Sequence, residues 1–348
     1  MMPTDAMAPW QQRVHDHAAG AIDAGRMGHA LLFCGPARLG KRRVAEQLAQ
    51  RVLCLAPDTG LRPCGACRAC RLYLSRSQKD PLEERPDKAL AHPFGHPAHP
   101  DAVFVGYAWR FTPSPQRQLT QISVDQVREL SERLSTTPQY GSAKVAIIEP
   151  ADAMNEAAAN ALLKTLEEPV PGRYLWLITD NPARLPATIR SRCQRLEFRL
   201  PPADEAATWL QAQGHPAAAA VEALAAARGH PGLADAWLRD GGMALRRAVA
   251  AELGRVARND ASALEVAKAW TGDDDADKRL RHAADIAVAE AAGLTDPLRI
   301  RKLAAWFDAA NRTRDLLRTT VRADLAVAEL LLSWRSAAGG DTARGVAK

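Results

Sequence analysis

Short apolar runs alternate with helix-patterned segments over the first 200 residues. Four runs predict β-strands, of which the first three are continuously apolar and the fourth is more amphipathic. They cover residues 29–35, 144–148, 174–178 and 195–199. Apolar positions at near-helical spacing predict helices over residues 10–30, 41–55, 123–135 (capped by Ser123) and 152–168. Strands that alternate with helices favour an α/β fold with a parallel sheet.

The pattern changes twice further along the chain. Residues 76–120 are rich in proline and have few periodic apolar positions, so we interpret most of them as a loop insertion with a short strand at 102–105. After Pro201 no strand is predicted. Helices separated by Gly and Pro are expected over 203–240 and 243–336, which indicates two helical parts behind the α/β domain.

The composition is that of a globular protein. The chain has 348 residues, of which 47% are hydrophobic and 25% charged. It contains no run of about 18 apolar residues that would span a membrane. The N-terminus lacks the basic-then-apolar layout of a signal peptide, so we expect a cytoplasmic protein. The net charge of +6 permits a polyanionic partner without requiring one.

A glycine-rich stretch follows the first predicted strand and opens the next predicted helix. Gly35, Gly40 and Lys41 fit the G-x-x-x-x-G-K pattern of a phosphate-binding loop, whose backbone N–H groups and Lys contact phosphates. Arg42 stands where this pattern requires Ser or Thr to hold Mg²⁺. Glu149-Pro150 follows the second buried strand, where an ATPase places acids that hold Mg²⁺ and activate water. Both departures argue against ATP hydrolysis, while nucleotide binding stays open.

Four of the six cysteines form a C-x9-C-x2-C-x2-C pattern, made by Cys54, Cys64, Cys67 and Cys70. Four thiolates suit tetrahedral Zn²⁺ and leave no open position, which indicates a structural site. The alternatives are a disulfide pair, which the cytoplasm disfavours, and an iron–sulfur cluster, whose pattern usually has a closely following fourth Cys. Cys34 and Cys193 stand apart and are interpreted as ordinary thiols.

Arginines crowd into the segment between the third and fourth predicted strands, at positions 184, 190, 192, 195 and 199. For most of them a solvated basic surface is the simpler interpretation. The alternative for one of them is an arginine finger, a guanidinium offered to the γ-phosphate in a neighbouring subunit. Such a residue accelerates phosphoryl transfer roughly 10³–10⁵-fold.

Taken together, the sequence resembles the delta-prime subunits of bacterial DNA polymerase III, in the clamp-loader group of AAA+ proteins. The resemblance covers residues 10–200 and rests on the cysteine cluster and four further stretches. These stretches are residues 25–32, 124–128, 151–169 and 185–193. The resemblance implies an AAA+ P-loop-type domain over 1–200 with a zinc module at 54–70, a small helical lid domain over 201–241 and an all-α collar domain over 242–338. Residues 339–348 are expected to form a disordered tail.

The resemblance also implies roles for individual residues. Ser191, Arg192 and Cys193 match a Ser-Arg-Cys motif, so Arg192 is expected to act in trans on ATP bound by a neighbouring gamma or tau subunit. The family's zinc cysteines match Cys54, Cys64, Cys67 and Cys70. Gly232-Leu233-Ala234 has Ala where active loader subunits carry Arg, a third departure from an ATPase.

The leading hypothesis is a non-hydrolysing, stator-like clamp-loader subunit that carries a structural Zn²⁺. Its expected partners are gamma/tau and delta subunits, with the sliding clamp and primed DNA reached through the complex and no membrane involved. One alternative is a catalytically active gamma/tau-like AAA+ ATPase. Another is a zinc-containing nucleic-acid-binding protein, although the basic residues are scattered rather than grouped in a groove with stacking aromatics.

Overall fold

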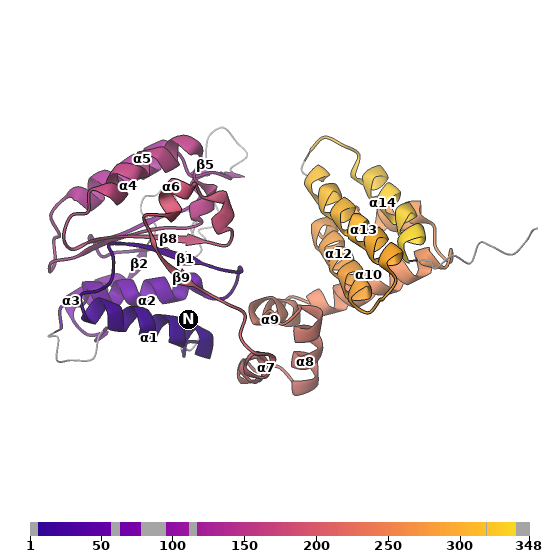
Figure 1. The fold of residues 1–348 in the computed structure, drawn as a ribbon, viewed down its shortest axis with the longest axis horizontal. Helices are drawn as coiled ribbons and strands as arrows, with labels where there is room; N and C mark the ends of the chain where they lie inside the picture. The colour runs from indigo at the N-terminus through magenta and orange to yellow at the C-terminus, as the bar shows by residue number, and fades with distance from the viewer. Residues whose placement is uncertain (1–5, 57–62, 78–94, 111–116, 318, 339–348) are drawn as a thin grey trace, which may run out of the picture. The chain divides into compact units, whose positions relative to one another are not determined.

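The computed structural model describes residues 6–56, 63–77, 95–110, 117–317 and 319–338. The chain forms two compact units (Figure 1). The first comprises Met1–Trp209 and His230–Gly232, and the second comprises Leu210–Gly229 and Leu233–Lys348. The boundary of the expected lid and collar domains near residue 241 stays a prediction, and the expected disordered tail lies outside the described residues.

A five-stranded parallel sheet forms the centre of the first unit, which confirms the predicted α/β fold. Its strand order is β4-β7-β8-β1-β9, and every neighbouring pair is parallel. The strands are β4 (Ala102–Val105), β7 (Lys144–Ile148), β8 (Arg173–Thr179), β1 (Ala30–Cys34) and β9 (Gln194–Glu197). Each expected strand is present, although β9 ends two residues early.

Helices cover both faces of this sheet (Figure 1). On one face, α1 (Pro9–Asp23) and α2 (Lys41–Leu53) pack against alternate strand residues such as Leu31 and Phe33. On the other face, α4 (Val124–Ser135) and α5 (Glu156–Glu167) pack against the intervening strand residues, such as Leu32. Successive strand side chains point to opposite faces, so runs buried on both sides are continuously apolar.

Some predicted boundaries were wrong. The helix expected over 10–30 ends at Asp23, because Gly25 adopts a left-handed φ of +64° and turns the chain. The helix expected from residue 152 begins at Glu156, since a short 3₁₀ turn at Ala151–Ala153 comes first and the Asn155 side chain then caps α5. The predicted cap at Ser123 is confirmed, because its hydroxyl accepts from the backbone N–H of Gln126.

The proline-rich segment contains more structure than predicted. Besides β4, short antiparallel pairs join β2 to β3 and β5 to β6. These strands are β2 (Arg76–Ser77), β3 (His96–Pro97), β5 (Trp109–Arg110) and β6 (Arg117–Gln118), and helix α3 (Arg68–Leu74) precedes them. Two-residue strands are too short to leave a periodic signal. Residues 78–94 and 111–116 of the segment lie outside the described part of the chain.

The described residues after 200 form helices and no strand, as predicted. These helices are α7 (Ala203–Ala212), α8 (Ala217–Ala226), α9 (Pro231–Arg239), α10 (Gly242–Ala257), α11 (Ala263–Trp270), α12 (Ala276–Ala292), α13 (Pro297–Leu316) and α14 (Ala323–Ala338). Buried Trp270, Trp306 and Trp334 lie in the core of the last helices. Among the helices described, none has the length and apolarity to cross a membrane.

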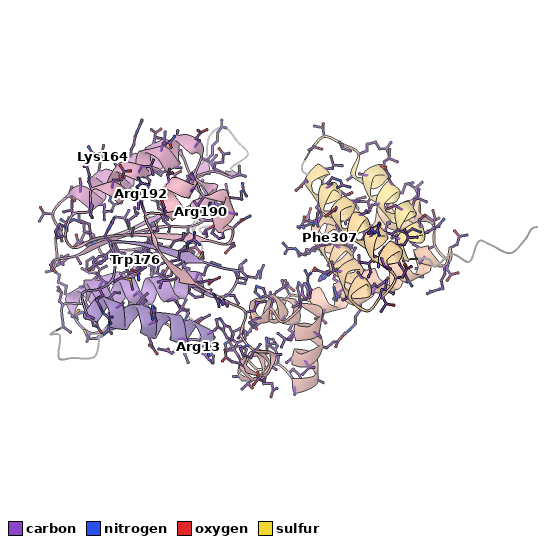
Figure 2. All side chains as sticks on the ribbon, viewed as in Figure 1. Arg13, Lys164, Trp176, Arg190, Arg192 and Phe307 are labelled. Carbon is purple, nitrogen blue, oxygen red and sulfur yellow. The ribbon has the colours of Figure 1, made fainter. Side chains whose placement is uncertain are left out.

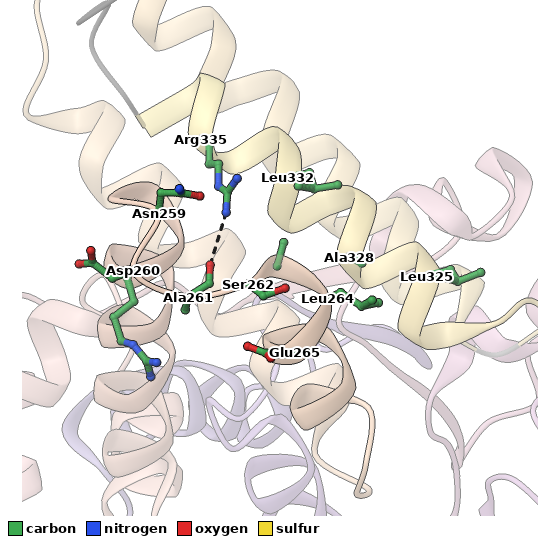
Figure 3. Close-up of a pocket in the computed structure, with 12 residues that line it drawn as sticks. Asn259, Asp260, Ala261, Ser262, Leu264, Glu265, Leu325, Ala328, Leu332 and Arg335 are labelled. Carbon is green, nitrogen blue, oxygen red and sulfur yellow. Dashed lines mark hydrogen bonds between the residues drawn. The ribbon is translucent and has the colours of Figure 1, made fainter.

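The second unit also carries a groove of about 730 Å³ between α11 and α14 (Figure 3). Leu264, Leu325 and Leu332 line it and are 43%, 50% and 53% exposed. At one end the Arg335 guanidinium donates to the carbonyl oxygen of Ala261 over 3.4 Å. No residue predicted to bind phosphate or metal, or to act as a finger, lines this groove.

Candidate functional site

The glycine-rich loop connects the carboxyl end of β1 to α2, as predicted. Gly35 and Gly40 have φ values of +137° and +84°, which glycine adopts without strain. A Cβ at Gly35 would collide with the carbonyl oxygen of Phe198. Trp10 and the Gln11 side chain both donate to the Leu39 carbonyl oxygen over 3.1 Å. Helix α1 and the chain after β9 therefore fix the conformation of this loop.

Lys41, the expected phosphate ligand, is saturated by groups of its own chain. Its Nζ donates to the carbonyl oxygens of Gly35 (2.8 Å) and Pro36 (2.6 Å) and lies 2.7 Å from a carboxylate oxygen of Asp180. An ammonium has three N–H donors, and these are three acceptors. The side chain is 4% exposed. Phosphate binding would have to break contacts that Lys41 already makes.

Arg42 fills the place where a metal-binding hydroxyl is expected, and it binds the acid that would share the metal. Its Nη1 lies 2.9 Å from the Glu149 carboxylate, and its Nε lies 2.8 Å from Glu46. Burial raises the pKa of Glu149, although the Arg42 charge acts in the opposite direction. A guanidinium thus supplies the positive charge that Mg²⁺ would bring to this carboxylate.

The four predicted metal ligands meet at one point. The Sγ atoms of Cys54, Cys64, Cys67 and Cys70 lie within 4.8 Å of one another. Those of Cys64 and Cys70 are 4.0 Å apart, close to the roughly 3.8 Å expected across a tetrahedral site with Zn–S bonds of about 2.3 Å. The donor set and its spacing fit a structural metal such as zinc.

Backbone N–H groups support these sulfurs. The N–H groups of Ala56, Cys67 and Cys70 donate to the Sγ atoms of Cys54, Cys64 and Cys67. Burial alone raises the pKa of Cys67, but hydrogen bonds from backbone and side chains lower it to about 6. Such donors favour the thiolate form that binds metal.

Helix α3 continues directly from this cluster, and the residues that follow it contact α2. Cys67 is the N-cap of α3, and Arg76 follows the end of the helix. The Arg76 Nη2 lies 2.8 Å from Glu46, the same carboxylate that binds Arg42. The cysteine module is therefore joined to α2 by alternating charges.

Arg192, the predicted finger, lies on the surface beside α5 and α6 (Ala187–Arg190) (Figure 2). Its Nη2 lies 2.6 Å from the Glu167 carboxylate, and its Nη1 donates to the Thr188 carbonyl oxygen over 2.9 Å. Ser191 is exposed and its hydroxyl donates to the same carbonyl over 3.2 Å. Arg192 is 37% exposed, so the guanidinium is accessible from outside the chain.

Sequence reasoning missed the partners of these residues. Asp180, Glu46 and Glu167 bind Lys41, Arg42 and Arg192, and none was predicted. Asp180 had a usable signal, because it follows β8 immediately and ligand-binding groups gather at the carboxyl ends of parallel strands. Glu167 lies inside a stretch that carried the family resemblance, but its role depends on the fold.

The parallel sheet, with a glycine loop and helix after β1, defines a P-loop-type α/β protein whose metal-binding position is altered. Residues 10–202 match the family described as DNA polymerase III, delta subunit. The chain belongs to the delta-prime family of DNA polymerase III subunits. The delta-prime subunit of Pseudomonas aeruginosa is 34% identical over 264 residues, which cover 75% of this chain and 70% of that relative.

The chain is also similar to other DNA polymerase III subunits, over smaller shares of its length or at lower identity. The delta-prime subunit of Escherichia coli is 34% identical over 65% of this chain and 59% of its own length. The tau subunit of Bacillus subtilis is 29% identical over 54% of this chain and 28% of its own length. A gamma subunit-related protein of Thermotoga maritima, known from a crystal structure, is 16% identical with a TM-score of 0.46, covering 94% of this chain and 99% of that one.

Proposed function

We propose that the protein is a non-hydrolysing subunit of the DNA polymerase III clamp loader. In this role it acts as a rigid, stator-like member of the complex and offers Arg192 in trans to ATP on a neighbouring gamma or tau subunit. The complex then loads the sliding clamp on primed DNA. In this proposal Ser191, the residue after α6, positions Arg192, because the Ser191 hydroxyl and the Arg192 guanidinium donate to the same Thr188 carbonyl oxygen.

The position of Arg192, just before strand β9, carries this proposal. Arg192 precedes β9, which pairs with β1 so that Gln194 lies opposite Leu31. Arg192 is therefore at the amino edge of the parallel sheet. The glycine loop follows the opposite, carboxyl end of β1. A five-residue strand spans about 16 Å, which separates Arg192 from its own loop by more than the length of its side chain, so we expect a phosphate that it binds to come from another chain.

Four features argue that the chain does not hydrolyse ATP itself. Lys41 is held by its own loop and by Asp180. Arg42 occupies the metal-binding position and pairs with Glu149. Pro150 has no group that could polarise water, and Ala234 stands where an active loader subunit carries Arg.

The names of the relatives support the proposed partners. Relatives that are named gamma/tau and delta-prime subunits point to a complex with gamma/tau and delta subunits. The sliding clamp and primed DNA are reached through this complex, in the cytoplasm. We assign residues 201–241 to a lid domain and 242–338 to a collar domain that joins the subunits.

Reconstitution tests the proposed role. Complexes of gamma/tau and delta subunits are prepared with and without this chain, and ATPase activity and clamp loading are measured. We expect both activities to depend on the added chain, while the purified chain alone hydrolyses no ATP. Robust turnover by the purified chain that Lys41→Ala abolishes would instead identify a gamma/tau-like ATPase.

Nucleotide binding by the free chain gives a separate prediction. Because Lys41 and Arg42 already have internal partners, we expect a fluorescent ATP analogue with Mg²⁺ to bind with a Kd above about 1 mM, equivalent to less than about 4 kcal/mol. Fluorescence anisotropy measures this, with a gamma/tau subunit as the positive control. Magnesium-dependent binding in the micromolar range, lost in Lys41→Ala, would contradict the prediction.

A further inference from the structure

The guanidinium of Arg192 is occupied by groups of its own chain. One partner is the Glu167 carboxylate, 2.6 Å from Nη2, and the other is the Thr188 carbonyl oxygen, 2.9 Å from Nη1. Glu167 is the last residue of α5, whereas Arg192 comes two residues after the end of α6. Two different elements therefore set the direction in which this side chain points.

The two partners differ in charge. The Thr188 carbonyl is neutral and lies within α6, so a hydrogen bond to it is compatible with an anion on the remaining donors. The Glu167 carboxylate places a negatively charged oxygen beside Nη2. Like a phosphate oxygen, it is an anionic acceptor for the N–H donors of the guanidinium. A γ-phosphate that binds the Nη2 donor of Arg192 has to take the place of this carboxylate, because both anions need the same N–H group.

Both side chains are partly open to solvent, with exposed fractions of 37% for Arg192 and 49% for Glu167. Exposed ion pairs are weak and shift an equilibrium by about two- to fivefold. The pair is therefore strong enough to favour one orientation of the arginine in the free chain, and weak enough to yield to a doubly charged phosphate that binds through two hydrogen bonds.

From this geometry we infer that Glu167 is a positioning residue that occupies Arg192 as an internal substitute for the neighbour's γ-phosphate. On assembly, the phosphate replaces the carboxylate, and the Thr188 carbonyl keeps the guanidinium in place during the exchange. The inference rests on the proposed role of Arg192 as a finger. It adds that Glu167 competes with nucleotide and lowers the apparent affinity of the neighbouring site for ATP.

The test uses Glu167→Gln in the full chain, reconstituted with gamma/tau and delta subunits. Glutamine keeps the size of the side chain and removes its charge. The measured quantity is the Arg192-dependent turnover, obtained by subtracting the rate of the Arg192→Ala complex at each ATP concentration. We expect the apparent KM for ATP to fall about two- to fivefold and kcat to stay unchanged. A merely structural contact would give weaker assembly, a higher KM or a lower kcat.

Glu168→Gln is the matched control, because it removes the same charge from the adjacent, exposed residue. We expect it to leave KM unchanged, and we expect Glu167→Gln to have no effect when combined with Arg192→Ala. If Arg192→Ala slows hydrolysis but Glu167→Gln leaves KM unchanged or raises it, this inference is wrong and the finger assignment stands. An equal decrease with Glu168→Gln would also overturn it. If Arg192→Ala has no effect, both are wrong.

Discussion

Arg192→Ala is expected to reduce ATP turnover at the adjoining gamma/tau site by about 10³-fold or more, because arginine fingers contribute roughly 10³–10⁵ to the rate of phosphoryl transfer. The guanidinium stabilises charge that develops on the phosphate oxygens, and alanine offers no donor in its place. The ATPase rate of the whole complex should fall by the fraction of the total turnover that this one site contributes. Single-turnover kinetics of the reconstituted complex, stimulated by primed DNA, measure the effect.

Two further variants separate this role from general surface charge. Arg195→Ala removes the same charge three residues away from an exposed position on β9, and we expect a rate close to wild type. Arg192→Lys keeps the charge but loses the planar pair of donors, so we expect a rate between those of wild type and Arg192→Ala. Unchanged turnover in a complex that gel filtration shows to contain Arg192→Ala would refute the finger assignment.

The sheet could be predicted because its signal is local. A strand buried on both faces needs apolar residues at successive positions, and the runs at β1, β7 and β8 show this directly. The helix boundaries depended on events that apolar spacing does not record. Gly25 ends the first helix through its backbone conformation, and Asn155 starts α5 through a side-chain cap.

The candidate sites divide in the same way. The glycine-rich loop and the cysteine cluster could be located from the sequence because both patterns have fixed spacings within a short stretch of chain. The pairs that determine how these sites behave join residues far apart. Arg42 and Glu149 are separated by 107 positions in the sequence. Lys41 follows the loop after β1, whereas Asp180 directly follows β8. Only the parallel order of the strands brings these groups to one edge.

The charge pairs also connect the cysteine module to helix α2, which follows the glycine-rich loop. Glu46 binds Arg42 on one side and Arg76 on the other, and Arg76 is placed by α3, which begins at Cys67. Tyr73 of α3 is 1% exposed and packs into the core beneath the sheet. A change that releases α3 should therefore expose the buried Tyr73 side chain and break the ion pair between Arg76 and Glu46.

Cys64→Ser is expected to reduce the zinc content of the purified protein from about one ion per chain to nearly none. Serine cannot supply the thiolate that completes a four-sulfur site. Metal binding then no longer holds α3, and loss of the Tyr73 packing should cost about 3–5 kcal/mol, comparable to truncating a buried aromatic residue. For a unit of this size, the melting temperature should fall by roughly 10 °C. Elemental analysis and thermal unfolding measure the two effects.

Cys193→Ala is the matched control for this prediction, since Cys193 is a buried cysteine outside the cluster. Burial raises the pKa of Cys193 to about 11, which keeps it a neutral thiol and a poor metal ligand. We expect this variant to retain its zinc. Because the finger does not contact the cluster, Cys64→Ser protein that still assembles should support normal turnover at the neighbouring site. Full zinc content in Cys64→Ser, or equal zinc loss in Cys193→Ala, would show that the four cysteines do not form the metal site.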